Sequence, residues 1–266
     1  MQQLLGSESA TTLTVSLFGR FSVQHGNDTL AALDPRLGQA LFSYLLLYQD
    51  QPHRRDELAR LLWDDVAVAQ AKSNLDQALH QLQTALATQA GSPRPDLLQI
   101  EPGWIQLHST AGLRLDAALF ESAFNLCQNR DSRQLTLAQM QMLQSAVELY
   151  QGDLLAGWLQ TWCIYERERF QYQYLAMLDK LMNYCIAHQA YATGIRYGAR
   201  ILHYDQARER THRQLIQLYT LAGDPIGAFR QYERCVAFLQ QALGVGPAQQ
   251  TRKLYDQIRA AYTHNL

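Results

Sequence analysis

Two stretches decide the fold of the first part of this chain: QAKSNLDQALHQLQTALA at residues 70–87 and LLQIEPGWIQLHS at residues 97–109. In the first stretch, leucines recur at steps of four, three and four residues and so form one stripe of an amphipathic helix. In the second stretch, apolar and polar residues alternate on both sides of Glu101-Pro102-Gly103, which predicts a hairpin. A long helix followed by a hairpin is typical of a winged helix.

The residues before this helix supply the other parts of that fold. Residues 13–19 and 20–25 alternate like two strands and are followed by the turn residues Gly26-Asn27-Asp28. Asp34-Pro35 resembles a helix start, and apolar residues recur at helical spacing from Leu37 to Tyr48 and again in 55–63. We therefore expect a winged-helix domain at residues 13–110, preceded by a loosely ordered or disordered N-terminus at residues 1–12.

Helical periodicity replaces strand signals after Leu115. The chain resembles itself at an offset of 34 residues, which superposes Gly194 on Ala228, and 34 residues is the tetratricopeptide (TPR) period. Further helices are expected at 135–150, 162–188 and 248–262. The predicted fold class is mainly α with a small β part, a winged helix followed by an all-α TPR-like domain at residues 111–266.

Composition narrows the class of protein. Of the 266 residues, 47% are hydrophobic and 18% are charged, and no run of eighteen apolar residues occurs, so we expect a cytoplasmic protein that is not inserted in a membrane. The four cysteines form no CxxC pair and the eight histidines show no metal-binding spacing. We expect no metal, no cofactor and no catalytic residues, and hence no enzyme.

Several short motifs then show a family resemblance. They are SLFGRFSV (16–23), RRDELARLLW (54–63), SNLDQALHQLQTAL (73–86), LDAALFE (115–121), YQGDLLAGW (150–158), ERERF (166–170), AGDPIGAFRQYER (222–234) and LGVGPAQQTRKLYDQI (243–258). With them the chain resembles regulators of the antibiotic-regulatory-protein type, which join a winged helix like that of OmpR and PhoB to a bacterial transcriptional activator domain. The resemblance implies an activator that binds promoter DNA and contacts RNA polymerase or another regulatory protein, and a homodimer is a further expectation.

A winged helix reads DNA with the face of its third helix opposite the core stripe. A rotation of about 100° per residue turns Ser73, Gln77 and Thr84 outward, flanked by Gln70, His80 and Gln81. Nearby cations are candidates for phosphate contacts. The predicted DNA-binding residues are Arg36, Arg54, Arg55, Lys72, Ser73, Asn74, Gln77, His80, Gln81 and Thr84. The alternative for all of these residues is that they form a solvated surface without a DNA-binding role. For Trp104, the alternatives are packing beneath the hairpin and contact with the minor groove.

The third predicted helix departs from the family pattern, and this difference allows functions other than DNA binding. Relatives place arginines where this chain has Asp76, Gln81 and Gln83, and residues 13–110 hold 7 basic against 10 acidic residues. The second hypothesis is therefore a winged helix that has lost its DNA affinity and acts as a protein-interaction module. An enzyme or a ligand-binding repeat protein is the third. The tyrosine-rich helices of the second half suit either a peptide groove or a repeat core.

Overall fold

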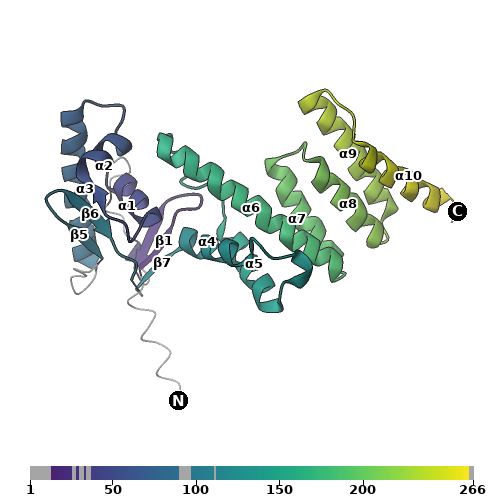
Figure 1. Cartoon of the computed structure of the whole chain (residues 1–266), viewed down its shortest axis with the longest axis horizontal. Coiled ribbons are helices and arrows are strands. Elements are labelled where there is room, and N and C mark those ends of the chain that lie inside the picture. Colours follow the sequence, from purple (N-terminus) through teal and green to yellow (C-terminus); the bar gives the residue numbers. More distant parts are fainter. Residues whose placement is uncertain are drawn as a thin grey trace, which may run out of the picture. The chain divides into compact units, whose positions relative to one another are not determined.

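The computed structural model describes residues 13–25, 28–29, 33, 37–89, 97–110 and 112–263, which fall into two compact units (Figure 1). The first unit contains the described residues up to Ser122 together with Glu148–Gln171, and the second contains Ala123–Val147 and the described residues from Tyr172 onward. These two units are defined by the contacts within each of them. The functional boundary expected between residues 110 and 111 stays a prediction, and the expected disorder at residues 1–12 lies outside the described residues.

The first sheet of the first unit has the order β3-β2-β1-β7. Its strands are β1 (Leu13–Ser16), β2 (Ser22–His25), β3 (Asp28–Thr29) and β7 (Leu113–Leu115). Strand β1 is antiparallel to β2 and parallel to β7, and the alternation places Leu13 and Val15 in the core. The hydropathy pattern predicts β1 and β2 but not β7, because three residues are too few to show an alternation.

Three helices and a second sheet complete the winged helix. The helices are α1 (Gly38–Leu47), α2 (Arg55–Leu62) and α3 (Val68–Gln89). The second sheet has the order β4-β6-β5, formed by β4 (His53–Arg54), β5 (Leu98–Ile100) and β6 (Trp104–Leu107). The expected hairpin is therefore present, and its turn is closed by mutual backbone hydrogen bonds between Glu101 and Trp104. Mainly helical structure with a small β part is confirmed.

The leucine stripe of α3 forms the core of the winged helix. Leu75, Leu79 and Leu82 are buried, and helices α1 and α2 both pack against α3. Burial of each leucine contributes roughly 1.5–3 kcal/mol, so the stripe fixes the rotation of the helix about its axis. Leu86, the last residue of the expected stripe, is only half-buried.

A buried carboxylate joins the first sheet to the helix that follows it. Helix α4 (Asp116–Cys127) begins at Asp116, whose oxygens accept hydrogen bonds from the backbone N–H groups of Leu17 at 2.9 Å and Phe18 at 3.0 Å. The N–H of Ala117 also donates to this carboxylate at 2.7 Å. Asp116 is 8% exposed, so these donors have little access to water as an alternative partner.

Residues 148–171 belong to the first unit because they cover Phe18. The Phe18 ring lies 4.9 Å from the ring of Phe120, 4.8 Å from Tyr150 and 5.4 Å from Phe170, and it is 3% exposed. The guanidinium of Arg167 holds the adjoining loop by donating to the carbonyl oxygens of residues 154, 155 and 158. Aromatic packing between distant segments is not visible in hydropathy periodicity.

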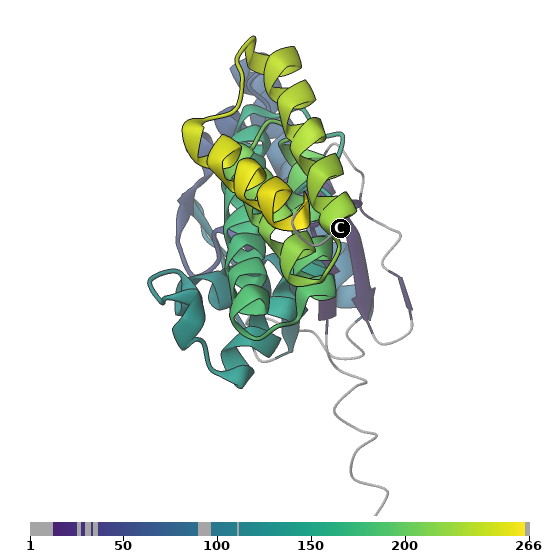
Figure 2. The same ribbon diagram turned by 90° about the vertical axis from the view of Figure 1, so that its right-hand side faces the viewer.

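The second unit is made of helices and one short 3-10 turn, η1 (Ser132–Gln134). Its helices are the end of α4, most of α5 (Leu137–Leu149), the C-terminal part of α6 (Thr161–Ala187), α7 (Tyr191–Tyr204), α8 (Glu209–Leu221), α9 (Pro225–Leu243) and α10 (Gln249–Thr263). Helices α7, α8 and α9 pack in succession, and α10 packs against both α8 and α9 (Figure 2). The helices expected at 135–150, 162–188 and 248–262 are confirmed.

The 34-residue period corresponds to a repeated helix start. Helix α7 begins at Tyr191 and α9 at Pro225, which are related by that offset. Close packing requires the small residues of α7, because a Cβ atom added at Gly194 would lie 3.0 Å from Leu218 and one added at Gly198 would lie 2.5 Å from Leu215. The offset of 34 residues in the sequence therefore corresponds to a recurrence of helix starts in the second unit.

Several tyrosines of the second unit contribute to its core. Tyr174 and Tyr197 are buried, and the rings of Tyr232 and Tyr255 stack with their centroids 4.0 Å apart. Tyr172, in contrast, is 70% exposed. The core interpretation of the tyrosine-rich helices therefore holds for these buried and stacked residues.

We predict that Asp116→Asn lowers the free energy of unfolding of the first unit by about 2–4 kcal/mol, because a buried N–H and the new amide group are left without acceptors. The matched control is Asp50→Asn, since Asp50 is exposed and accepts its hydrogen bonds from Ser109, including one from the N–H at 2.9 Å, which an amide oxygen can also accept. Its effect should stay within about 0.5 kcal/mol. All four tryptophans lie in the first unit, so urea unfolding followed by their fluorescence measures both variants. Equal effects would contradict the role of Asp116.

Candidate nucleic-acid interface

The exposed face of α3 lies opposite its buried leucines. Lys72, Ser73, Gln77, His80 and Thr84 are exposed on this helix. The hydroxyl of Thr84 donates to the carbonyl oxygen of His80 at 2.8 Å, so its donor is already used within the helix. Ser73, Gln77 and His80 follow one another at steps of three and four residues and form a polar stripe along the helix.

Two other predicted residues lie at the edges of this face. Asn74 is half-buried and accepts a hydrogen bond from the amide of Gln70 at 2.8 Å. Gln81 is also half-buried, with its Oε1 atom enclosed, and a Cβ atom added at Gly38 of α1 would lie 3.0 Å from that oxygen. Gln81 therefore packs toward α1. Arg36 lies outside the described residues.

The cations near α3 are paired with carboxylates. Arg55 Nη2 lies 2.5 Å from Asp76 Oδ1, and Lys72 Nζ lies 2.9 Å from Asp56 Oδ1. The Lys72 ammonium lowers the pKa of Asp56 below its usual value. Arg54 is 3.7 Å from Glu57, a longer and looser contact between exposed groups. These pairs leave little net positive charge at the N-terminal part of α3.

The paired charges line an open hollow beside the hairpin. It has a volume of about 420 Å³ and is bounded by Arg54, Arg55, Asp56, Lys72, Leu75, Asp76, Pro102, Gly103 and Trp104. The N–H of Arg55 donates to the carbonyl oxygen of Gly103, which ties the start of α2 to the hairpin turn. Helix α3 and the hairpin tip therefore border the same hollow.

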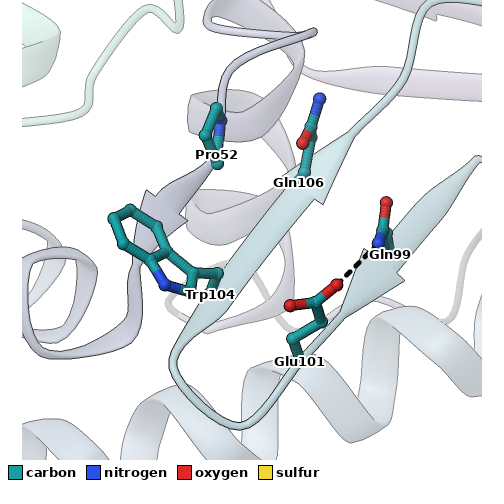
Figure 3. Close-up of a pocket in the computed structure, with 5 residues that line it drawn as sticks. All are labelled: Pro52, Gln99, Glu101, Trp104 and Gln106. Atoms are coloured by element: carbon teal, nitrogen blue, oxygen red, sulfur yellow. Dashed lines mark hydrogen bonds between the residues drawn. The ribbon is translucent and has the colours of Figure 1, made fainter.

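The outer face of the hairpin is polar around one tryptophan (Figure 3). Trp104 is 44% exposed, so the hairpin does not cover it, and the Arg54 guanidinium lies 6.0 Å from the centre of its ring. Gln99 donates to Glu101 at 2.8 Å on the same face. An exposed aromatic ring and amide groups can contact a sugar-phosphate edge or another protein equally well.

A family comparison identifies the class of protein to which this geometry belongs. Residues 115–259 match the model of the bacterial transcriptional activator domain, which is more than half of the chain. The chain belongs to this family. The resemblance to the bacterial transcriptional activator domain that the sequence motifs predict is thus confirmed.

A solved structure shows the same fold over nearly the whole chain. It is described as Mycobacterium tuberculosis EmbR in complex with a low-affinity phosphopeptide, with a TM-score of 0.69 and 19% sequence identity. The similarity covers 94% of this chain but 65% of that chain, so part of EmbR has no counterpart here. No curated protein sequence matches significantly. The fold of this chain, a winged helix followed by a helical domain, agrees with that comparison.

Three further observations concern metal binding, membrane insertion and the cysteines. In the described part of the chain, no three His, Cys, Asp or Glu side chains are grouped so that they could bind a metal ion. No described helix is both long and apolar enough to span a membrane. The four cysteines are free and buried, and burial raises the pKa of each thiol.

Sequence reasoning does not find the two ion pairs that shape this surface. Lys72 and Asp76 are four residues apart on α3 and predict a pair with each other, but in the structure both bond to α2. The aspartates that neutralise cations become apparent only when the packing of α2 against α3 is known. A charge count that treats Arg55 and Lys72 as free therefore overestimates their contribution.

We predict that Gln81→Arg destabilises the first unit by about 1–3 kcal/mol, because a longer charged side chain must displace α1 beside Gly38. Gln83→Arg is the matched control, since Gln83 is exposed two residues away on the same helix and its replacement should stay within about 0.5 kcal/mol. Urea unfolding followed by tryptophan fluorescence compares them. If both variants are as stable as the wild type, Gln81 does not pack as described.

Proposed function

We propose that this protein is a transcriptional regulator, a sequence-specific DNA-binding activator, whose α3 enters the major groove while the β5–β6 hairpin lies beside it on the duplex. The observation that carries the proposal is the exposed polar stripe of Ser73, Gln77 and His80 on α3, a helix that borders one hollow together with the hairpin, in a chain of a transcriptional activator family. Amide, hydroxyl and imidazole groups can hydrogen-bond to base edges, and Gln pairs bidentately with adenine.

The paired cations set the expected strength of binding. A phosphate must displace a carboxylate before Lys72 or Arg55 can contribute fully to the interaction. We therefore expect weak binding whose affinity depends only shallowly on salt. Specificity then depends on base contacts more than on the total positive charge.

We further propose that the helical unit contacts RNA polymerase or another regulatory protein and can support a homodimer, and that the protein acts in the cytoplasm, where its DNA lies. Stacked helices offer a continuous surface for such contacts, as in other repeat arrays. Phosphopeptide binding is described for EmbR, of which about a third has no counterpart in this chain. We do not extend it to this regulator.

The competing function is that of an interaction module without DNA affinity. The specific observation that favours it is the neutralisation of Arg55 and Lys72 by Asp76 and Asp56. The two functions differ in whether a duplex is bound at all.

We predict that the full chain binds a duplex enriched from a random library, and that Gln77→Ala weakens binding roughly tenfold by removing a base contact. Gln141→Ala is the matched control, because Gln141 is an exposed glutamine on α5, in the other unit. Fluorescence anisotropy measures both affinities. Failure to enrich any duplex would contradict DNA binding and favour the interaction module.

We also predict that Asp56→Asn strengthens binding and steepens the salt dependence, because Lys72 is released to contact phosphate. Each additional neutralised phosphate changes the slope of log affinity against log salt by about −0.9. Titrations at several salt concentrations test this. A steep slope for the wild type, unchanged in the variant, would show that carboxylates do not mask the cations.

A further inference from the structure

Asp76 is the acidic residue of α3 and lies at the edge of its proposed reading face, beside α2. Its side chain is 67% exposed, whereas that of its partner Arg55 is 26% exposed. The guanidinium binds Oδ1 of Asp76, and the structure gives Oδ2 no partner among the described residues. Arg55 thus holds one oxygen of a largely exposed carboxylate, and the second oxygen can accept a hydrogen bond from a ligand.

The arrangement also reduces the repulsion that an acidic group would meet near DNA. Arg55 supplies a positive charge 2.5 Å from the carboxylate, and the start of α2 that carries it is tied to the hairpin through the carbonyl oxygen of Gly103. The pair is close to neutral as a unit, so its approach to phosphates is less unfavourable than that of a lone aspartate.

A carboxylate only accepts hydrogen bonds, which restricts the bases it can recognise. In the major groove, guanine presents the acceptors N7 and O6, and thymine presents the acceptor O4, so each would repel it. Adenine offers an N6 donor, but the acceptor N7 lies beside it. Cytosine offers its N4 amino group without an acceptor on the same base edge, and it is the base that Asp and Glu pair with.

We infer that Asp76, oriented by Arg55, is a specificity-determining residue that accepts a hydrogen bond from the N4 amino group of a cytosine in the major groove. This inference rests on the proposed DNA-binding function and adds the base recognised at one position. Ser73, Gln77 and His80 lie within about one helical turn of Asp76, so they contact the neighbouring bases.

The test is enrichment of duplexes from a random library by the full chain, followed by sequencing, with wild type and Asp76→Asn. Asparagine keeps an oxygen for Arg55 but presents an amide donor where the wild type presents an acceptor, so one position of the enriched motif should lose its preference for cytosine while the others stay the same. Affinity of the variant for the wild-type motif should fall roughly tenfold. Circular dichroism confirms that the variant is folded.

Asp56→Asn is the matched control, because Asp56 has a similar exposed fraction, 55%, and also pairs with a cation but lies on α2. It should change affinity and leave the motif as it is. A wild type that enriches a motif which Asp76→Asn leaves unaltered overturns this inference while DNA binding stands. A wild type that enriches no duplex overturns the proposed function, and this inference with it.

Discussion

Helix α3 has to bury one stripe of leucines, and the rest of the winged helix depends on that constraint. Leu75, Leu79 and Leu82 fill the space between α1 and α2, so the helix cannot rotate without exposing them. The opposite face is fixed by the same packing and carries Ser73, Gln77 and His80 toward solvent. The same leucine periodicity therefore determines both which side chains form the core and which side chains of α3 are exposed.

The exposed surface around α3 differs from a general phosphate-binding surface because its cations are paired with carboxylates. Arg55 and Lys72 stand at the N-terminal part of α3, but each has a carboxylate within 3 Å. Exposed ion pairs contribute little to stability. In the proposed function, these pairs lower the nonspecific attraction for DNA and, at Asp76, add an acceptor to the reading face. In the proposed function, specificity is kept while total affinity is reduced.

The sequence predicts the elements that repeat regularly. The spacing of the leucines gives α3, the alternation around Glu101-Pro102-Gly103 gives the hairpin, and the 34-residue offset gives the common start of α7 and α9. What it does not predict depends on contacts between distant segments. The three residues of β7 are too short to show a pattern, and the carboxylate of Asp116 meets Leu17 only after folding. At the candidate site, the helical rotation of α3 predicts from the sequence that Ser73 and Gln77 are exposed. The packing of Gln81 and the pairing of Arg55 with Asp76 cannot be predicted in this way, because they depend on the positions of α1 and α2.

The central claim is that α3 recognises particular promoter sequences in the cell. Genome-wide immunoprecipitation of the intact protein, followed by sequencing of the bound DNA, tests it most directly when wild type and Gln77→Ala are compared at equal expression. We predict discrete peaks upstream of genes in the wild type that share one motif and are lost or much reduced in the variant. Signal spread evenly over the genome, or peaks that persist unchanged without Gln77, would contradict recognition by this face of the helix.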